Sequence, residues 1–383
     1  MKNVLLIPGF LSDTFSTVEK LSFHLTEILQ EEGYSVVWLV QDVRSCFNVY
    51  KNSINVGSLN EPVYVTELKK CKITFVTKKL YKFNLIKDYF IFKEIIKNYK
   101  IDCVIVQFGL ERFYAAMFSK IFGVKVIWYE RWASLHSKFW FLKKIFYHLF
   151  VDFFIANSEF TAKTLPRNKR IFILQNSIEV KKMTNLDKTE KNLLKLKLNL
   201  ENFKYIVLMI AAFRSEKRYD LAIEILKRIL LQRKDVCFVF LGNGELREFF
   251  LKLVDNLNLQ DNVMMPGHVN NIEEFLLVAD VLMLTSFNEP FGNCIIEGMS
   301  YSLPVVSFNN GGPAEIIKDN ETGYLVPFGD VELFSSRLSN ILKNDELRKV
   351  MGEKGFCRVN ENFNILNWKI QIPRIFNEIS AIK

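Results

Sequence analysis

The sequence has few features of metal binding, disulfide bonding or membrane insertion. Its six cysteines are scattered without the Cys-x-x-Cys spacing of zinc sites and redox motifs. No apolar run is long enough to cross a bilayer, and the apolar residues 4–7 before Pro8 are too few for the core of a signal peptide. We therefore expect a globular protein of the reducing cytoplasm, without a zinc site or a disulfide framework.

Internal repeats, low-complexity segments and nucleic-acid-binding motifs are missing as well. The net charge is nonetheless +9, with a pI near 9.0, which favours anionic partners. Without a recognition motif, nucleic acid is a disfavoured partner. Because the chain is also rich in aromatic residues, with 35 Phe, the anionic inner face of a cell membrane is a candidate docking surface.

The chain length and the alternation of strand and helix patterns predict two α/β domains. A chain of 383 residues with 49% hydrophobic content is large enough for two cores. Short apolar runs alternate with amphipathic segments in both halves, which predicts parallel sheets covered on both faces. The glycine-free, lysine-rich segment 179–200 is the predicted linker. The expected strands include 36–40, 103–106, 124–128, 236–241 and 281–284, and the expected helices include 17–31, 86–99, 113–121, 220–231 and 272–278.

Residues 285–299 carry the strongest functional signal. The preceding run 281–284 predicts a buried strand, and apolar residues at helical spacing follow Gly292. Glu289 is therefore expected in the loop and Glu297 inside the helix. A helix N-terminus after such a strand binds phosphate oxygens, and neighbouring carboxylates accept hydrogen bonds from sugar hydroxyls. Together these groups suit a nucleotide-sugar.

The same segment resembles a known family of enzymes. Glu289 and Glu297 match the Glu-x7-Glu signature of the family 4 retaining glycosyltransferases of GT-B fold. Further motifs follow at the spacing of that family: LPVV at 303–306, GGPAEII at 311–317 and a Thr-Gly turn within 321–327. The resemblance implies two Rossmann-like domains whose parallel sheets face a central cleft. It implies an acceptor-binding domain at 1–180, a nucleotide-sugar-binding domain at 181–360, and a terminal helix at 361–383 that returns to the first domain.

The resemblance also implies basic residues that hold the donor diphosphate. Lys217 aligns with the family's lysine, and Arg214 is the nearest candidate for its arginine, although the common spacing points to position 212. Such cations offset the charge that grows on the leaving phosphate. The alternative is that the cluster 214–218 caps a strand in solvent. Because no Asp-x-Asp occurs, we expect neither a metal nor another cofactor.

Several further residues are implied as donor contacts. Gly242 lies in the family's Gly-x-Gly turn; read instead as a dinucleotide fingerprint, this turn lacks the third glycine. His268 and Val269 match the segment that walls the nucleotide base. Gly9 would let the backbone approach the diphosphate, although many relatives have two consecutive glycines there. The helix N-terminus implied for the phosphates comprises Phe291, Gly292 and Asn293.

The family's active-site histidine is replaced in this chain. Tyr129, Glu130 and Arg131 stand where relatives commonly have a His after the strand. Glu130 or Arg131 contacts the sugar or the acceptor, or the two form an ion pair. His136 is a further candidate for the missing residue.

The resulting hypothesis is a retaining, metal-independent glycosyltransferase. It would move a hexose or N-acetylhexosamine from a nucleoside-diphosphate sugar, with UDP favoured, to a glycan or lipid-linked glycan. The setting would be bacterial surface polysaccharide synthesis, either lipopolysaccharide or capsule. The alternatives are a non-catalytic GT-B binding subunit, and a GT-B sugar-nucleotide epimerase or phosphorylase.

Residues 137–150 form a candidate membrane-binding helix. Aromatic rings and lysines recur there at helical spacing, as in helices that lie flat on anionic membranes. Alternatively the helix is part of a core, with Phe139, Leu142, Phe146 and Leu149 inward. The expected location is the cytoplasm, with peripheral binding to the membrane if the first alternative holds.

Overall fold

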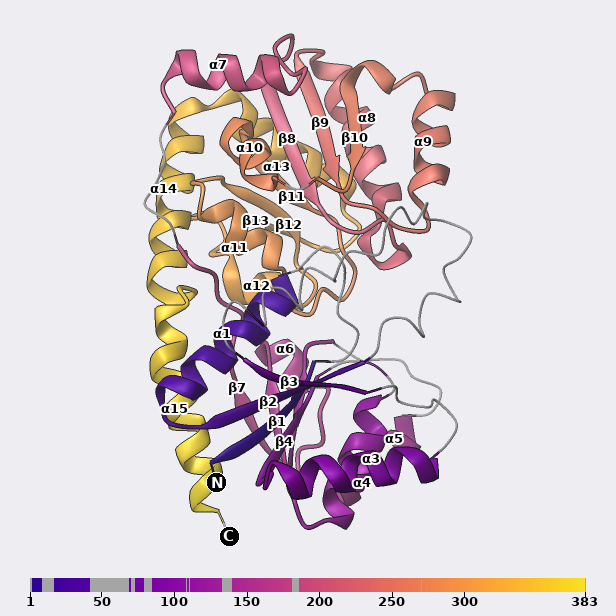
Figure 1. The fold of residues 1–383 in the computed structure, drawn as a ribbon. Helices are drawn as coiled ribbons and strands as arrows, with labels where there is room; N and C mark the ends of the chain where they lie inside the picture. The colour runs from indigo at the N-terminus through magenta and orange to yellow at the C-terminus, as the bar shows by residue number, and fades with distance from the viewer. Residues whose placement is uncertain are drawn as a thin grey trace. The chain divides into compact units, whose positions relative to one another are not determined.

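The computed structural model describes residues 2–8, 17–41, 69, 73–78, 85–107, 109, 111–132, 140–180, 186–269 and 271–382. The chain divides into two compact units, one of residues 1–175 with 366–383 and one of residues 176–365. The sequence-based boundaries lay at 180/181 and 360/361. Each unit contains a parallel sheet with helices on its faces (Figure 1).

The first unit is built on a seven-stranded sheet of order β3-β2-β1-β4-β5-β6-β7 in which every described pairing is parallel. Its strands are β1 (Asn3–Ile7), β2 (Ser35–Gln41), β3 (Thr74–Lys78), β4 (Cys103–Val106), β5 (Lys125–Glu130), β6 (Phe153–Ala156) and β7 (Arg170–Ile173). Its helices are α1 (Thr17–Glu31), α3 (Leu85–Asn98), α4 (Glu111–Ile121), α5 (Trp140–Phe150), α6 (Glu159–Ala162) and α15 (Leu366–Ala381).

The central strands of this sheet are apolar on both faces because helices cover both faces. On one face, Val104 and Trp128 pack with residues of α3, α4 and α5, including Tyr147. On the other face, Trp38 donates its indole N–H to Thr26 of α1 at 2.8 Å. Helix α15 packs against α1 (Figure 1). The C-terminal helix therefore belongs to the core of the first unit.

The second unit has a six-stranded parallel sheet of order β10-β9-β8-β11-β12-β13. Its strands are β8 (Tyr205–Ile210), β9 (Val236–Leu241), β10 (Val263–Gly267), β11 (Val281–Leu284), β12 (Val305–Phe308) and β13 (Gly323–Val326). Its helices are α7 (Lys188–Lys197), the 3-10 turn η2 (Ser215–Lys217), α8 (Tyr219–Gln232), α9 (Arg247–Asn256), the 3-10 turn η3 (Gln260–Asn262), α10 (Ile272–Val278), α11 (Asn293–Met299), α12 (Pro313–Ile316), α13 (Val331–Lys343) and α14 (Asp345–Asn362).

The segment 179–200, which was predicted to be a linker, contains the helix α7. Asp187 and Glu190 form a reciprocal capping box that satisfies free backbone N–H groups at the start of this helix. Leu194 packs against the core, and the buried Lys195 donates to the carbonyl oxygens of Phe203 and Lys204 at 2.8 and 3.0 Å. The cap and these contacts fold the segment despite its polar composition.

Candidate functional site

The strand order of the second unit reverses between β8 and β11. Strands β9 and β10 continue from β8 on one side, and β12 and β13 continue from β11 on the other. Ligands of open α/β sheets bind at the carboxyl ends of the strands beside such a reversal. The turn η2 follows β8 and carries Lys217, while the loop after β11 carries Glu289. The reversal therefore brings together two residues that are 72 positions apart.

Lys217 and Glu289 form an ion pair with an Nζ to Oε2 distance of 2.7 Å. The lysine side chain is 19% exposed and the glutamate side chain 11%. Burial lowers the pKa of Lys217, but attraction and hydrogen bonding by Glu289 outweigh it, so that the net pKa is raised. The ammonium group is therefore firmly charged and already paired with an anion.

Main-chain contacts fix the two loops against each other. Thr285 donates its hydroxyl to the carbonyl oxygen of Lys217 at 2.8 Å. The backbone N–H of Phe287 donates to the carbonyl oxygen of Glu216 at 2.7 Å. Lys217 is therefore held by the segment that leads to its partner Glu289.

A glycine turn after β12 supports the loop of Glu289. The backbone N–H of Gly312 donates to the carbonyl oxygen of Glu289 at 2.8 Å. A Cβ atom at Gly312 would lie 2.4 Å from Cα of Phe291, so no side chain fits there. The GGPAEII motif thus shapes the loop that presents Glu289.

The N-terminus of α11 follows Glu289 directly. Gly292 precedes the helix with a φ of +105°. Asn293 Oδ1 accepts a hydrogen bond from Asn176 Nδ2 at 2.8 Å. Phe291 is 2% exposed, with its ring 5.8 Å from that of Phe363. Phe291 can therefore serve a ligand only through its main chain, because its side chain is in the core.

Glu297 lies within α11 and is partly exposed. The pKa of the Cys294 thiol depends on the charges near the start of this helix. Burial, Glu289 and Glu297 together raise the pKa of Cys294, while Lys217 opposes them. Both carboxylates therefore act electrostatically on the same first turn of α11, on either side of the helix N-terminus.

The turns after β8, β9 and β10 contact one another through the main chain. Gly242 has a φ of +141°, and a Cβ atom there would lie 2.1 Å from the carbonyl oxygen of Ala211. The backbone N–H of Gly242 donates to the carbonyl oxygen of Gly267 at 2.9 Å. Beside this edge of the sheet, Arg214 and His268 are exposed, and Val269 packs partly against the core. The structure thus places the sequence-predicted donor residues of the second unit at the carboxyl ends of its strands.

Glu130, at the end of β5 in the first unit, is buried in a network of donors. Its carboxylate accepts from Trp128 Nε1 at 3.1 Å and from the hydroxyl of Tyr147 at 3.3 Å. Arg112 Nη1 and Lys143 Nζ lie 3.4 and 3.8 Å from its oxygens. Burial lowers the pKa of Lys143 and raises that of Tyr147. In this structure Glu130 holds β5, α4 and α5 together.

The alternative of an ion pair between Glu130 and Arg131 was wrong. Adjacent residues of a strand point to opposite faces of the sheet. Glu130 faces α4 and α5, whereas the guanidinium of Arg131 lies over the ring of Tyr129, with Cζ 4.1 Å from its centroid. The candidates Gly9 and His136 lie outside the described residues.

The sequence interpretation missed the polar groups at the strand ends of the first unit. Gln107 and Asn157 are both buried, directly after β4 and β6. Their only signal in the sequence is a polar residue at the carboxyl end of an apolar run.

Within the described ranges, no three His, Cys, Asp or Glu side chains lie close enough together to hold a metal ion. The expectation that the protein needs no metal or cofactor stays a prediction. In the same part of the chain, no helix combines the length and the apolar character needed to cross a membrane.

Comparisons with known proteins agree with this geometry. Residues 190–357 match the model of the family described as glycosyl transferases group 1. The chain is 30% identical over 219 residues to the N-acetyl-alpha-D-glucosaminyl L-malate synthase of Bacillus anthracis, covering 57% of this chain and 56% of that protein. It is 31% identical over 150 residues to the lipopolysaccharide core biosynthesis glycosyltransferase LpsE of Rhizobium meliloti, covering 39% of this chain and 43% of that protein. The chain thus matches about half the length of these relatives.

The solved structures extend the likeness to both units. HepE of Anabaena, in complex with UDP and glucose, has a TM-score of 0.80 at 15% identity, covering 99% of this chain and 100% of that chain. The two parallel-sheet units and this likeness show the GT-B fold. The family match adds that residues 190–357, within the second unit, are similar to the glycosyl transferases group 1.

Proposed function

We propose that this protein is a retaining, metal-independent glycosyltransferase of family 4, which transfers a hexose or N-acetylhexosamine from a UDP-sugar to a glycan or lipid-linked glycan. The observation that carries this proposal is the Lys217–Glu289 pair beside the N-terminus of α11, at the reversal of the strand order. The UDP and glucose bound by HepE support the donor class. The names of the relatives support N-acetylglucosamine as a sugar and surface polysaccharide synthesis as the setting.

In this proposal each group of the site has one task. The ammonium of Lys217 and the exposed Arg214 neutralise the leaving diphosphate, whose oxygens also face the backbone N–H groups of α11. Glu289 exchanges its contact with Lys217 for the hydroxyls of the donor sugar, and Glu297 binds the ribose. The leaving phosphate accepts the proton of the acceptor hydroxyl on the same face of the sugar, so that the configuration is retained.

Donor binding tests the proposal directly. Thermal unfolding with UDP-, GDP- and dTDP-sugars should show stabilisation by UDP-sugars, because a ligand that binds only the native state raises its stability. Glu297→Ala should weaken UDP binding by about 1–3 kcal/mol through lost charged hydrogen bonds. Glu332→Ala, which changes an exposed carboxylate of α13, is the matched control. Unchanged UDP affinity in Glu297→Ala would contradict the assigned role.

Activity measurements test the proposed metal independence and the proposed retention of configuration. Full turnover in the presence of a chelator is expected, and a loss that magnesium restores would contradict metal independence. The anomeric configuration of the product, followed by NMR, should equal that of the donor. Hydrolysis or epimerisation of the donor without transfer would favour the other enzyme classes.

The surface of α5 supports a membrane-bound acceptor. Phe141, Leu142, Ile145 and Leu149 are 70, 61, 43 and 56% exposed on this helix. Leu142 and Leu149 are therefore not core residues, in contrast to one of the two alternatives from the sequence. Phe146 does pack inward, with its ring 5.0 Å from that of Phe113. Phe139 lies outside the described residues.

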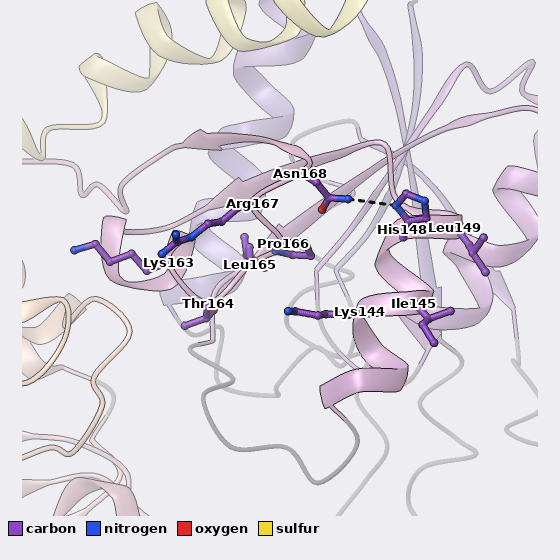
Figure 2. A pocket seen from close by; sticks show the side chains of 10 residues that line it. All are labelled: Lys144, Ile145, His148, Leu149, Lys163, Thr164, Leu165, Pro166, Arg167 and Asn168. Atoms are coloured by element: carbon purple, nitrogen blue, oxygen red, sulfur yellow. Dashed lines mark hydrogen bonds between the residues drawn. The ribbon is translucent and has the colours of Figure 1, made fainter.

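Basic side chains border this apolar face. A hollow of about 760 Å³ lies between α5 and the segment 163–168. Figure 2 shows Lys144 pointing toward this segment, which also carries Lys163 and Arg167. Lys143, by contrast, is turned inward to Glu130. We propose that the α5 face binds the anionic inner leaflet of the membrane, where basic groups meet lipid phosphates and apolar groups meet acyl chains.

Vesicle sedimentation tests this surface. The triple variant Lys144→Glu, Lys163→Glu, Arg167→Glu should lose at least about 3 kcal/mol, or roughly 100-fold, of affinity for anionic vesicles. The control variant Lys20→Glu, Lys93→Glu, Lys97→Glu has the same charge change at exposed sites of α1 and α3 and should retain most binding. Equal loss in both variants would show a general charge effect without a defined surface. Absence of wild-type binding would refute membrane docking.

A further inference from the structure

Three adjacent strands of the first unit are each followed by a buried polar side chain with an unpartnered atom. Gln107 follows β4, Arg131 follows β5 and Asn157 follows β6, and they are 0, 5 and 2% exposed. Among the described residues, no hydrogen-bond partner reaches Gln107 Nε2, Asn157 Oδ1 or any of the three guanidinium nitrogens of Arg131. Buried polar atoms are nearly always paired, so five unpaired atoms at one sheet edge call for an explanation.

The strand register places the three side chains on one face of the sheet. Glu130 pairs with Ala156, which puts Arg131 beside Asn157, and Asn157 Nδ2 donates to the carbonyl oxygen of Arg131 at 3.4 Å. Val106 pairs with Trp128, which puts Gln107 beside Tyr129, the residue under the guanidinium of Arg131. Neighbouring residues of parallel strands present their side chains to the same face.

This face is the one that α1 covers, at a second reversal of strand order. The hydroxyl of Ser22 in α1 donates to Gln107 Oε1 at 2.8 Å. Strands β2 and β3 continue from β1, whereas β5, β6 and β7 continue from β4. Gln107 thus follows a strand at the reversal, which is the usual place for a ligand in an open α/β sheet.

Among the residues that the structure describes, no carboxylate forms an ion pair with Arg131. The guanidinium of Arg131 lies over the ring of Tyr129 instead. Burial lowers the pKa of Arg131, but an arginine stays charged in proteins. A buried cation without an anion strongly destabilises the native state. Such a cost is expected at a site that binds an anionic ligand.

We infer that Gln107, Arg131 and Asn157 bind an oxyanion of the acceptor, either a carboxylate or a phosphate. The fork of the arginine matches two oxygens of such a group, and the amide nitrogen of Gln107 supplies a further donor. The free oxygen of Asn157 accepts a hydrogen bond from a neighbouring acceptor hydroxyl. The inference rests on the proposed function, in which the first unit holds the acceptor, and it makes that acceptor acidic.

Anion binding to wild-type protein and to Arg131→Met tests the inference. Thermal unfolding and calorimetry at constant ionic strength would use inorganic phosphate and glucuronate as separate probes. At least one of them should stabilise the wild type, and the responding probe identifies the group. Its affinity should fall roughly 10- to 100-fold in Arg131→Met. Without anion, Arg131→Met should unfold at a higher temperature than wild type, because the uncompensated charge is gone.

Two further variants keep the test decisive. Arg170→Met removes an exposed arginine of β7 in the same sheet and should retain the anion effect. Gln107→Met removes a donor of the site but keeps the charge of Arg131, and it should also weaken anion binding. If neither probe binds, if Arg131→Met still binds the responding probe, or if that variant is less stable than wild type without anion, the inference is wrong. UDP binding, which uses the second unit, should be unchanged in all three variants. Loss of UDP binding in the wild type would refute the proposed function while leaving the anion result interpretable.

Discussion

The ion pair of Lys217 and Glu289 should contribute both to stability and to turnover. With an effective dielectric constant of ~20, two unit charges at their separation of 2.7 Å attract by about 6 kcal/mol before desolvation. Desolvation of the two largely buried groups offsets much of this attraction. Either single variant, Lys217→Met or Glu289→Gln, leaves the other group without its partner, and we expect each to lower the free energy of unfolding by about 2–3 kcal/mol. The double variant should lose clearly less than the sum of the two.

The two variants should differ in their ligand binding. Lys217→Met should bind UDP more weakly and should lower turnover by roughly 100- to 1000-fold, because its charge acts most strongly on the departing diphosphate. Glu289→Gln should bind UDP more tightly than wild type, since the ammonium is released for the phosphates. The same variant should transfer sugar slowly, because the carboxylate for the donor sugar is missing.

Denaturant unfolding measures the free energies of unfolding, calorimetry with UDP measures the affinities, and steady-state kinetics measures the turnover. Two results would refute the reasoning. Additive losses of stability in the double variant would show that the pair is not coupled. A turnover of Lys217→Met within about twofold of wild type, with only the KM raised, would show that the lysine binds ground state and transition state alike.

Three further predictions follow from contacts described above. Gly242→Ala should lower the free energy of unfolding by about 3 kcal/mol or more, because the added Cβ would overlap the carbonyl oxygen of Ala211. Thermal unfolding should show a loss of only about 1 kcal/mol for the control Gly123→Ala, since Gly123 has a φ of +72° and open space around it. Trp368→Ala should destabilise the first unit by about 3–5 kcal/mol while leaving UDP binding unchanged, because the ring is fully buried and its N–H donates to the carbonyl oxygen of Gln175; calorimetric unfolding with and without UDP checks this. The folded pKa of Lys217 is raised above its ordinary value of 10.5, so the contribution of this residue to stability is complete below that value and is lost as the pH rises through the folded pKa. The difference in free energy of unfolding between wild type and Lys217→Met should therefore stay constant from about pH 6 to pH 9 and shrink only above about pH 10.

The repeating patterns of the sequence were sufficient to predict most strands. Buried parallel strands are short apolar runs, and β11 occupies the run 281–284 that the sequence indicates. The motif around Glu289 and Glu297 likewise predicts a loop and a helix, which the structure contains. These features depend on residues that are close in sequence, so local sequence patterns are sufficient to predict them.

The remaining features depend on contacts that are distant in sequence. The pairing of Lys217 with Glu289 follows from β8 lying next to β11, which no local pattern encodes. Helix α14 has almost no separation of polar and apolar faces, because it buries glycines together with Met351 and Val359. The lack of a hydrogen-bond partner for the guanidinium of Arg131 in the described part of the chain could not be predicted either, since it depends on which side chains the fold brings near.

The glycine contacts of the second unit constrain how this site can evolve. The obstacle to a side chain at Gly242 or Gly312 is main chain, from Ala211 in one case and from Phe291 in the other. A rotamer change cannot relieve such an overlap, and a compensating substitution elsewhere does not move the obstructing atoms. Variation is far less costly at exposed positions of the same edge, such as Arg214 and His268. New donor preferences should therefore arise by exchanging exposed side chains on an inherited main-chain frame, and the sequence distance between two such proteins would say little about how their donors differ.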